Sequence, residues 1–333
     1  MQDRRGKSVR VSSRFLACLA TLLFTVGSVH ATDEFPYPTP EGYLRILSWN
    51  IEFLGERTPP RTQEQHNAIA SRMLTFDAAV MALQEIADQS VLEYIRGRMG
   101  ANWRIFFPEG GHETTLMYDT NKVELLQGEM WDDLRNAPYA DGPHCFQPSP
   151  AVTGVFRSVH GTNPQPFRVI CVAIRWGWTT PEDDIKKNEG RALRRKIVEL
   201  LNTPGEPREI FLIGDMNGDP DNIDTSMWGP HPTLAEGYTL LRLPKENGNG
   251  TTVVPPVWEM GIDHCYVTHE AKDFLAKPSA FVIREEYYGE DWQQFEETYS
   301  DHNPIFTDYR YHDVPPARAA YWELYDTASG IGR

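Results

Sequence analysis

The chain has 333 residues, 40% of them hydrophobic, and a formal net charge of −15. This composition supports a large buried core and excludes a largely disordered protein. The acidic balance argues against a protein whose affinity depends on many contacts with a polyanion, and it is compatible with a small phosphate ester or a metal-bridged substrate.

The first 31 residues have the pattern of a secretory signal peptide. Five basic residues precede the apolar run Phe15–Val26, and Val29-His30-Ala31 offers small residues at the spacing of a cleavage site. This run is too short to span a bilayer, and no later stretch is long enough, so we expect no transmembrane segment. Cleavage would take the formal charge from −15 to −19. A periplasmic or extracellular protein is therefore predicted, with an uncleaved anchor as the alternative.

Removal of this segment leaves three cysteines, Cys145, Cys171 and Cys265. Export permits disulfides, and three cysteines allow at most one intrachain bridge. Cys171 and Cys265 lie in apolar, strand-like runs, which favours buried thiols at both positions. A Cys145–Cys171 bridge is the alternative.

Along the chain, apolar runs alternate with helical patterns, which indicates an α/β domain over residues 32–311. Hairpin-like strand pairs favour a mixed rather than a purely parallel sheet. We expect an irregular segment over 128–150, a loop-rich stretch up to Pro256, and a tail of unknown role at 312–333. Helices are predicted at 62–75, 91–99 and 182–202, and strands at 44–49, 78–83, 103–107, 114–118, 151–156, 167–174, 210–213, 261–267 and 304–311.

Polar residues stand just beyond or at the border of several of these strands. Each alone has a structural explanation as a helix cap or an Asx turn. Their repetition favours a site, because ligands of open α/β sheets gather at strand ends. Carboxylates and an imidazole gathered there are the groups that metal-assisted attack on a phosphate ester requires. The positions are Asn50, Glu85, Asp215, Asn217, Asp263, Asp301 and His302.

Five short motifs that contain these residues occur in one characteristic order. They are Ser-Trp-Asn at 48–50, Leu-Gln-Glu at 83–85, Gly-Asp-Met-Asn at 214–217, Gly-Ile-Asp-His at 261–264 and Ser-Asp-His-Asn-Pro at 300–304. From about Leu44 to Tyr309 the chain resembles the deoxyribonuclease I-like enzymes of the endonuclease/exonuclease/phosphatase superfamily. The resemblance implies a four-layer α/β sandwich with two mixed β-sheets packed face to face.

The same resemblance implies a magnesium site at Glu85, with Asn50 and Asp301 close to the ion. Mg²⁺ prefers oxygen ligands and typically takes one or two carboxylates together with waters and a substrate phosphate. Mn²⁺ is the alternative ion.

Catalytic roles are also implied for the remaining motif residues. His302 would act as general base or phosphate contact, and Asp263 would hold its imidazole. Asp215 and Asn217 would position the attacking water and stabilise the pentacoordinate phosphorus. Whether the aspartate or the histidine takes the proton of the water is left open. His264, as the strand neighbour of Asp263, should point to the opposite face and is interpreted as structural.

One feature of the family pattern is missing. Such enzymes usually carry another histidine in a strand that reads Asn-x-His-Leu, and here Cys171 and Ala173 take the asparagine and histidine places. Arg175 lies two residues further along, and one hypothesis is that its guanidinium contacts the substrate phosphate. A weakened activity, or a non-catalytic binding protein on the same fold, is the alternative.

Together these features predict an exported, Mg²⁺-dependent phosphoesterase that hydrolyses a phosphate ester by direct attack of water. The resemblance favours a nuclease-like phosphodiesterase, whereas the acidic charge weighs against nucleic acid; a nucleotide or a phospholipid head group are the other substrates considered. A phosphomonoesterase and a phospholipid head-group hydrolase are the alternatives. We expect a monomer, with the toxin-like nuclease subunit of a larger assembly as a further hypothesis. Recognition could use Trp131, Trp176, Trp178, Trp228, Trp258 or Trp292, although packing roles are more common for tryptophan.

Overall fold

The chain divides into two compact units, Met1–Glu34 and Phe35–Arg333, and every described residue belongs to the second unit. The predicted signal peptide, the tail 312–333 and Cys145 lie outside the described residues. Among the residues that the structure describes, no helix combines the length and apolar content needed to cross a bilayer. The computed structural model describes residues 38–107, 113–136, 138–139, 146, 149–177, 179–218, 234, 240–246, 252–253, 261–284 and 290–310.

Two mixed β-sheets form the centre of the second unit. In the first, β1 pairs in parallel with β2 and antiparallel with β13; in the second, β8 pairs in parallel with β7 and antiparallel with β11. In the described part of the chain, the first sheet has seven strands, in the order β10 (Lys245–Glu246), β12 (Ala280–Val282), β13 (Ile305–Arg310), β1 (Tyr43–Asn50), β2 (Val80–Gln84), β4 (Thr115–Asp119) and β3 (Trp103–Phe106). The second sheet has six strands within the same residues, in the order β5 (Val123–Met130), β6 (Val152–Ser158), β7 (Phe167–Ala173), β8 (Ile210–Asp215), β11 (Asp263–Val267) and β9 (Leu241–Arg242).

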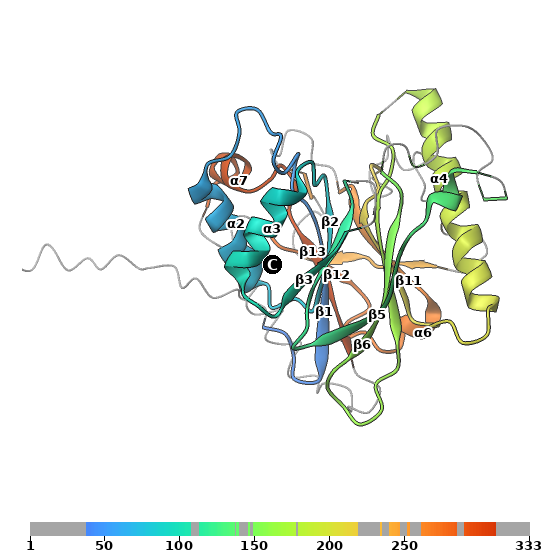
Figure 1. Cartoon of the computed structure of the whole chain (residues 1–333). Helices are drawn as coiled ribbons and strands as arrows, with labels where there is room; N and C mark the ends of the chain where they lie inside the picture. Colours follow the sequence, from blue (N-terminus) through green and yellow to red (C-terminus); the bar gives the residue numbers. More distant parts are fainter. Residues whose placement is uncertain are drawn as a thin grey trace, which may run out of the picture. The chain divides into compact units, whose positions relative to one another are not determined.

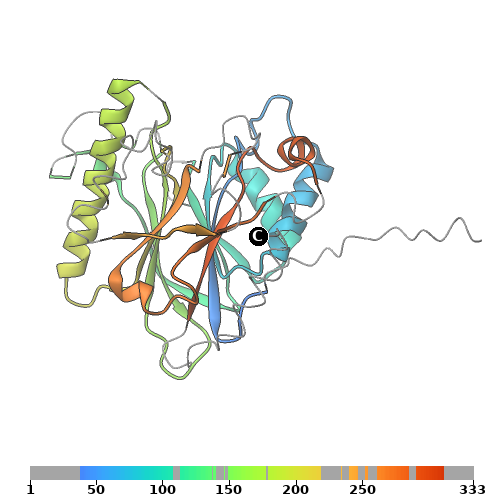
Figure 2. The ribbon, with the colours of Figure 1, turned by 180° about the vertical axis from the view of Figure 1, so that it is seen from behind.

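Helices cover the outer face of each sheet. Helices α2 (Gln63–Thr75), α3 (Gln89–Met99) and α7 (Trp292–Thr298) lie beside the first sheet, and α4 (Thr180–Asn202) lies beside the second (Figures 1 and 2). Short helical turns occur at η1 (Asp132–Arg135) and α6 (His269–Lys272). Helix α2 begins where Thr62 and Gln65 form a reciprocal capping box, which satisfies backbone donors at the helix start.

Three apolar layers hold the two sheets and their helices together, and strand β8 shows how. Phe211 and Ile213 face the first sheet, whereas Ile210 and Leu212 face α4. Successive strand residues point to opposite faces, so a strand buried on both sides needs apolar residues at every position. This explains the continuous apolar runs of the sequence. The predicted four-layer α/β sandwich is confirmed.

The predicted helices and strands are present with boundaries shifted by a few residues, while some elements escaped prediction. The expectation of an irregular segment over 128–150 is wrong for Gly128–Met130, which complete β5. This edge strand is half exposed, and a register shift between Leu125 and Gln127 interrupts its alternation of apolar and polar residues. The short elements β12, α6 and α7 were also missed.

The two described cysteines agree with the prediction of buried thiols. Cys171 and Cys265 are buried and free. The Cys171 sulfur accepts a hydrogen bond from Gln84 Nε2 at 3.1 Å. Burial raises the pKa of the Cys171 thiol to about 12, which keeps it protonated and unreactive.

Gly214, within β8, is required by close packing of the two central strands of its sheet. Its φ is +151°, and a Cβ there would come within 2.0 Å of the Val172 carbonyl oxygen of β7. We therefore expect Gly214→Ala to lower the free energy of unfolding by about 2–4 kcal/mol, measured by chemical denaturation. Gly97→Ala is the matched control, because Gly97 is exposed in α3 with open space around it and should gain about 0.5–1 kcal/mol. Equal stability of the two variants would contradict this packing role.

Candidate active site

The polar residues predicted from the sequence lie where the two sheets meet at one edge. Asn50 ends β1, Glu85 directly follows the parallel strand β2, and Asp215 ends β8. Asp263 begins β11 and stands opposite Asp215 in the antiparallel register. A hydrogen bond from Asn50 Nδ2 to Asp215 Oδ2, at 3.2 Å, joins the two sheets directly.

Two adjoining pockets open at this edge and share five lining residues. We name them the main pocket, with a volume of 550 Å³, and the side pocket, with a volume of 360 Å³. The main pocket is lined by Glu52, Phe53, Glu85, Trp176, Asp215, Asn217, Val253, Ile262, Asp301 and His302. The side pocket is lined by Phe53, Glu85, Glu113, Phe146, Ser149, Ala173, Ile174, Arg175, Trp176, Glu182, Glu189, Asp215 and Asn217.

His302 is held from several sides. Its Nδ1 shares a 2.8 Å hydrogen bond with Asp263 Oδ2, and both side chains are buried. The Ser300 hydroxyl accepts from the His302 backbone N–H at 3.0 Å and donates to the Asn50 carbonyl at 2.7 Å. Burial alone would lower the pKa of His302, but Asp263 and the nearby Asp215 and Asp301 outweigh it and raise this pKa. The predicted Asp263–His302 pair is therefore present.

Asp215 is almost fully enclosed, with 3% of its surface exposed. Burial raises its pKa to about 7, and the neighbouring Asp263 and Glu85 contribute while His302 opposes the shift. Its Oδ1 accepts the backbone N–H of Asn217 at 2.8 Å. A buried carboxylate that faces a pocket beside a histidine is a group that can accept or direct a proton.

Asn217 lines both pockets and has one unsatisfied atom. Its Nδ2 donates to the Ile174 carbonyl at 2.9 Å, which fixes the amide orientation. Its Oδ1 is buried and has no hydrogen-bond partner within the described part of the protein. A buried acceptor without a partner is costly, so this oxygen favours a donor from solvent or substrate.

Glu85 also lines the main pocket, and the fully buried Asn50 holds it without lining the pocket itself. Asn50 Nδ2 donates to Glu85 Oε1 at 2.9 Å, and the backbone N–H of Phe53 donates to Glu85 Oε2 at 3.2 Å. Asn50 Oδ1 accepts the Glu52 N–H at 3.0 Å. Asn50 thus orients the Glu85 carboxylate, while its direct ligation of a metal stays a prediction.

The donor set of the main pocket fits a hard divalent cation. Burial raises the pKa of Glu85 and brings that of Glu52 to about 7, and repulsion by the Asp301 carboxylate adds to both shifts. A bound cation would offset this crowding of negative charge. No group of three or more His, Cys, Asp or Glu side chains arranged for a metal occurs among the described residues. Glu85 and Asp301 would therefore supply one or two carboxylates, and waters and substrate oxygens the remainder, as Mg²⁺ allows.

Glu52 and two arginines were missed by the sequence reasoning. Glu52 lines the main pocket, and its carboxylate contacts Arg57 Nε at 3.1 Å and Arg61 Nη2 at 3.4 Å. Arg61 also donates to the Tyr299 carbonyl at 2.8 Å, which ties this loop to the segment before Asp301. In the sequence, the one signal that could have identified Glu52 was its position, an acidic residue two places after Asn50.

Backbone strain is concentrated around the two pockets. In the described part of the chain six non-glycine residues have a positive φ, and five of them line a pocket. Each such residue costs of order 1–3 kcal/mol, a cost found mainly at functional sites. The five are Glu52, Phe53, Glu85, Phe146 and Asn217, with φ between 35° and 58°.

The position of the absent histidine lies inside the site. Ala173 ends β7, pairs with Asp215 in the parallel register and lines the side pocket. Arg175 lines the same pocket, although it lies just beyond the strand and not within it. Its backbone N–H donates to Glu189 Oε2 at 2.9 Å.

Helix α4 sends two buried charged side chains to the loops around the site. Glu189 accepts from the backbone N–H groups of Arg175 and, at 2.7 Å, Phe146. Lys186 Nζ donates to the carbonyls of Gly177 and Asn217, the latter at 2.7 Å. Sequence reasoning identified this helix but not its polar inner residues, since helical periodicity marks only the apolar face.

The burial of Glu189 has a consequence for stability. Burial raises its pKa from 4.5 to about 7, so the folded protein binds this proton more tightly than the unfolded chain does. The contribution to stability is present below pH 4.5 and is lost as pH rises towards 7, by about 3 kcal/mol. We expect chemical unfolding at pH 4 and at pH 8 to show that the free energy of unfolding of Glu189→Gln, relative to that of the wild type, rises by about this amount between the two pH values. A difference between the two proteins that does not change with pH would contradict this.

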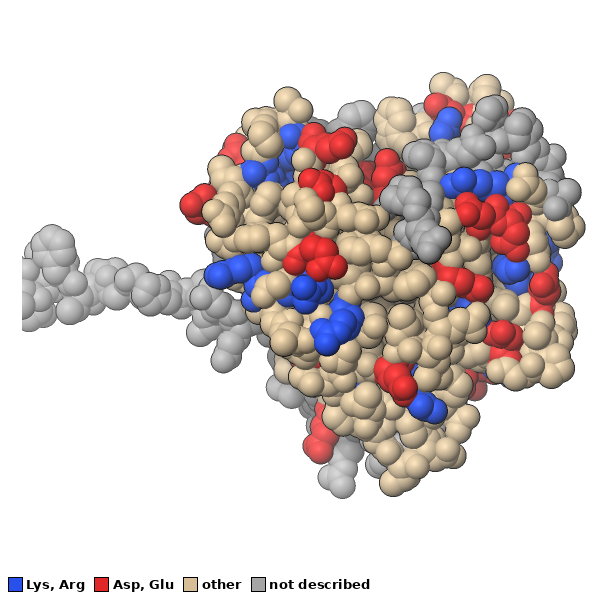
Figure 3. Space-filling model, in the orientation of Figure 1, with Lys and Arg blue, Asp and Glu red and all other residues tan. Residues whose placement is uncertain are grey.

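On the face shown in Figure 3, the described Lys and Arg side chains lie among Asp and Glu side chains and form no continuous basic stripe that would suit a long polyanion. Of the tryptophans considered for recognition, Trp176 is 69% exposed, Trp131 is buried and Trp292 is partly buried in the core. Trp178, Trp228 and Trp258 lie outside the described residues.

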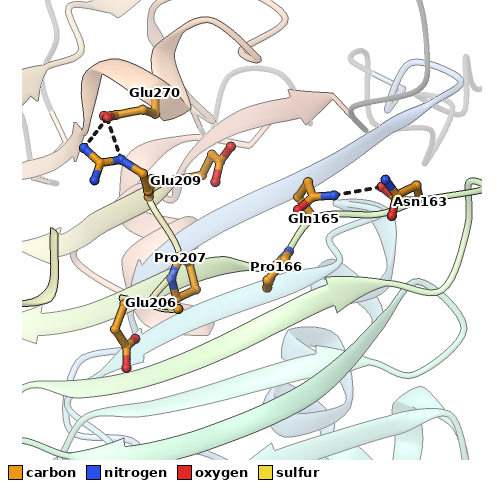
Figure 4. A pocket seen from close by; sticks show the side chains of 9 residues that line it. Asn163, Gln165, Pro166, Glu206, Pro207, Glu209 and Glu270 are labelled. Atoms are coloured by element: carbon orange, nitrogen blue, oxygen red, sulfur yellow. Dashed lines mark hydrogen bonds and ion pairs between the residues drawn. The ribbon is translucent and has the colours of Figure 1, made fainter. Parts of the chain in front are cut away.

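A larger pocket, of 610 Å³, lies at the second sheet, at the strand ends opposite those that carry the candidate site (Figure 4). It is formed by the β6–β7 turn, the loop before β8 and Glu270 of α6. Arg208 beside it is paired with Glu270 at 2.7 Å. It contains none of the predicted site residues, so volume alone does not identify the functional site.

Comparisons with known proteins agree with this geometry. The profile of the Endonuclease/Exonuclease/phosphatase family matches residues 47–302. No curated protein matches the sequence significantly.

Solved structures share the fold at low sequence identity. An endonuclease/exonuclease/phosphatase from Bacteroides vulgatus has 14% identity and a TM-score of 0.59, over 81% of this chain and 99% of that one. Danio rerio TDP2, solved with a single-strand DNA product, has 14% identity and a TM-score of 0.54, over 81% and 100%. The mannosyl-6-phosphatase Bt3783 of Bacteroides thetaiotaomicron has 14% identity and a TM-score of 0.52, over 79% and 98%. The chain is similar to all three in fold.

Proposed function

The chain belongs to the endonuclease/exonuclease/phosphatase family, and on that premise we propose that it is an exported, Mg²⁺-dependent phosphoesterase that hydrolyses a phosphate ester by direct attack of water. The observation that carries the proposal is the main pocket, whose lining includes Glu85, Asp215, Asp301 and His302. Asn50 and Asp263 are buried behind this lining, where they form hydrogen bonds with Glu85 and His302. A non-catalytic binding protein would have no need of this set. The basic leader and apolar run of residues 1–31 support export.

The reaction exchanges one phosphorus–oxygen bond for another. A water oxygen forms a new bond to phosphorus, the bond to the ester oxygen breaks, and the products are an alcohol and the hydrolysed phosphate. The proton of the water goes to a group that faces the main pocket, Asp215 or His302, and the leaving ester oxygen takes a proton from solvent water to become the alcohol. A magnesium ion held by Glu85 and Asp301 would supply a positive charge that polarises the phosphoryl oxygens.

The remaining side chains hold these groups in position. Asp263 fixes the imidazole of His302 through Nδ1, which directs Nε2 to the pocket. Asn50 keeps the Glu85 carboxylate turned towards the pocket. Arg175 takes over one role of the absent histidine, the contact to the negatively charged phosphate. It does not take over proton donation, because a guanidinium cannot readily release a proton.

Metal dependence is tested with bis(p-nitrophenyl) phosphate and p-nitrophenyl phosphate as substrates. We expect EDTA to abolish hydrolysis by the wild type and added Mg²⁺ to restore it. Glu85→Gln should bind metal more weakly, because it removes the most enclosed carboxylate of the proposed ion site. Mn²⁺ titration followed by electron paramagnetic resonance measures this directly, with an expected rise in Kd of at least tenfold.

Glu209→Gln, in the pocket at the opposite edge, is the control and should leave both activity and Mn²⁺ affinity unchanged. Hydrolysis that persists in EDTA would contradict the metal proposal. Export is tested by N-terminal sequencing of protein recovered from the periplasm or medium, where a chain that begins at Thr32 is expected.

A further inference from the structure

The side pocket extends the main pocket beyond the site of hydrolysis. The two pockets share Asp215 and Asn217, so a phosphate bound between them would have its ester group within reach of the side pocket. Asn217 Oδ1, which has no hydrogen-bond partner among the described residues and belongs to a residue that is 5% exposed, lies at this boundary and requires a donor. A hydroxyl or water hydrogen would satisfy it.

The wall of the side pocket is a built structure. Glu189, 1% exposed, holds the backbones of Arg175 and Phe146 together through its two carboxylate oxygens. Glu113 is also part of the lining, and its Oε2 accepts the Ser149 hydroxyl at 2.6 Å. These contacts pre-form the cavity before a ligand arrives, which lowers the entropic cost of binding.

The charges of this lining select against further phosphates. Five residues of the described lining carry carboxylates, and Arg175 is the one Lys or Arg among them. A polynucleotide that continued into the side pocket would bring its next phosphate against those carboxylates without a balancing cation. A substituent without further phosphates avoids this conflict.

The polar groups that remain are suited to hydroxyls. Glu113 supplies an acceptor and Ser149 a hydroxyl, and such mixed groups bind alcohols through paired hydrogen bonds. At the rim, the exposed rings of Trp176 and Phe53 offer flat apolar surfaces, 69% and 54% exposed. Aromatic faces of this kind pack against the C–H faces of sugar rings.

The geometry points to the side pocket as a subsite for a hydroxyl-rich group without further phosphates, such as a sugar or polyol, that carries a single phosphate as a monoester. This inference rests on the proposed function and names its substrate class. The side pocket receives the alcohol part of the ester, and the main pocket holds the phosphate.

The experiment compares three substrates with full-length wild-type protein in Mg²⁺. These are glucose 6-phosphate, p-nitrophenyl phosphate, which has no hydroxyls, and a short single-stranded oligodeoxynucleotide. We expect turnover of the two monoesters and at least tenfold lower kcat/KM for the oligonucleotide. Glu113→Gln should lower the ratio of kcat/KM for glucose 6-phosphate over p-nitrophenyl phosphate by at least tenfold, because it replaces a charged acceptor of sugar hydroxyls. Arg175→Ala, which removes a contact to the common phosphate, should keep that ratio within about twofold.

The possible failures are distinguishable. Preferred cleavage of the oligonucleotide, or an unchanged ratio in folded Glu113→Gln, would overturn the assignment of the side pocket and leave a phosphoesterase in place. The absence of chelator-sensitive hydrolysis of every probe would overturn the proposed function itself. Circular dichroism of each variant excludes misfolding as the cause, and Glu113→Asp provides a second, charge-retaining variant in which partial recovery of the ratio is expected.

Discussion

Replacing Asp215 by Asn is expected to lower kcat by about 10³–10⁴ while leaving KM within a few fold. The carboxylate is enclosed at the edge where the two sheets meet, and in the proposed reaction it takes the proton of the attacking water or orients that water. An amide of the same shape can accept a hydrogen bond from Asn50 or from the Asn217 backbone N–H but not from both, and it supplies no base and no negative charge. Steady-state kinetics with p-nitrophenyl phosphate at saturating Mg²⁺ measures the change.

Stability separates this effect from unfolding. Asp215 is buried beside Asp263 and Glu85, so removal of its charge should leave the Tm equal to or above that of the wild type. Asp273→Asn is the matched control, since Asp273 is exposed at the end of α6 and should retain full activity. Turnover by Asp215→Asn within tenfold of the wild type would remove this residue from the reaction.

Asp263→Asn should lower kcat by about 10²–10⁴ through its effect on His302. An asparagine amide can donate its N–H to Nδ1 of His302. This favours the tautomer in which Nδ1 is unprotonated and Nε2 carries the ring proton. Proton–nitrogen NMR of the His302 ring reports the tautomer directly. We expect a changed ring spectrum and a shifted pH–rate profile, which a merely structural role would not produce.

His264 offers the control for this substitution. It is the next residue of β11, and its Nε2 lies 3.2 Å from the Gly218 carbonyl, away from both pockets. We expect His264→Gln to reduce stability but not the rate constants of the folded fraction. Equal kinetic losses in the two variants would show that the orientation of the imidazole does not matter.

The candidate site residues could be predicted because each one borders an apolar strand in the sequence. Asn50, Glu85 and Asp215 follow such strands, and the order of their motifs supplied the fold through resemblance. The pattern also located the one departure, at Ala173. All of these positions lie at the same edge of the structure.

The groups that could not be predicted act through the backbone of distant segments. Glu189 and Lys186 bind backbone N–H and C=O groups of loops up to about 40 residues away, and backbone groups leave no pattern of side chains to recognise. Glu52 and Arg61 belong to a loop whose path no periodicity describes. Strand β5 was missed because a half-exposed edge strand with a register shift has no regular alternation.

The left-handed backbone conformations of Glu85 and Asn217 bear on how this protein would respond to laboratory evolution. Glycine adopts such angles without steric cost, so a screen that rewards heat tolerance alone would tend to accept glycine at these positions. Each gain would delete a functional side chain. Variants selected only for stability would therefore tend to lose activity. A screen that also selects for catalysis would have to find its stabilising substitutions elsewhere in the chain.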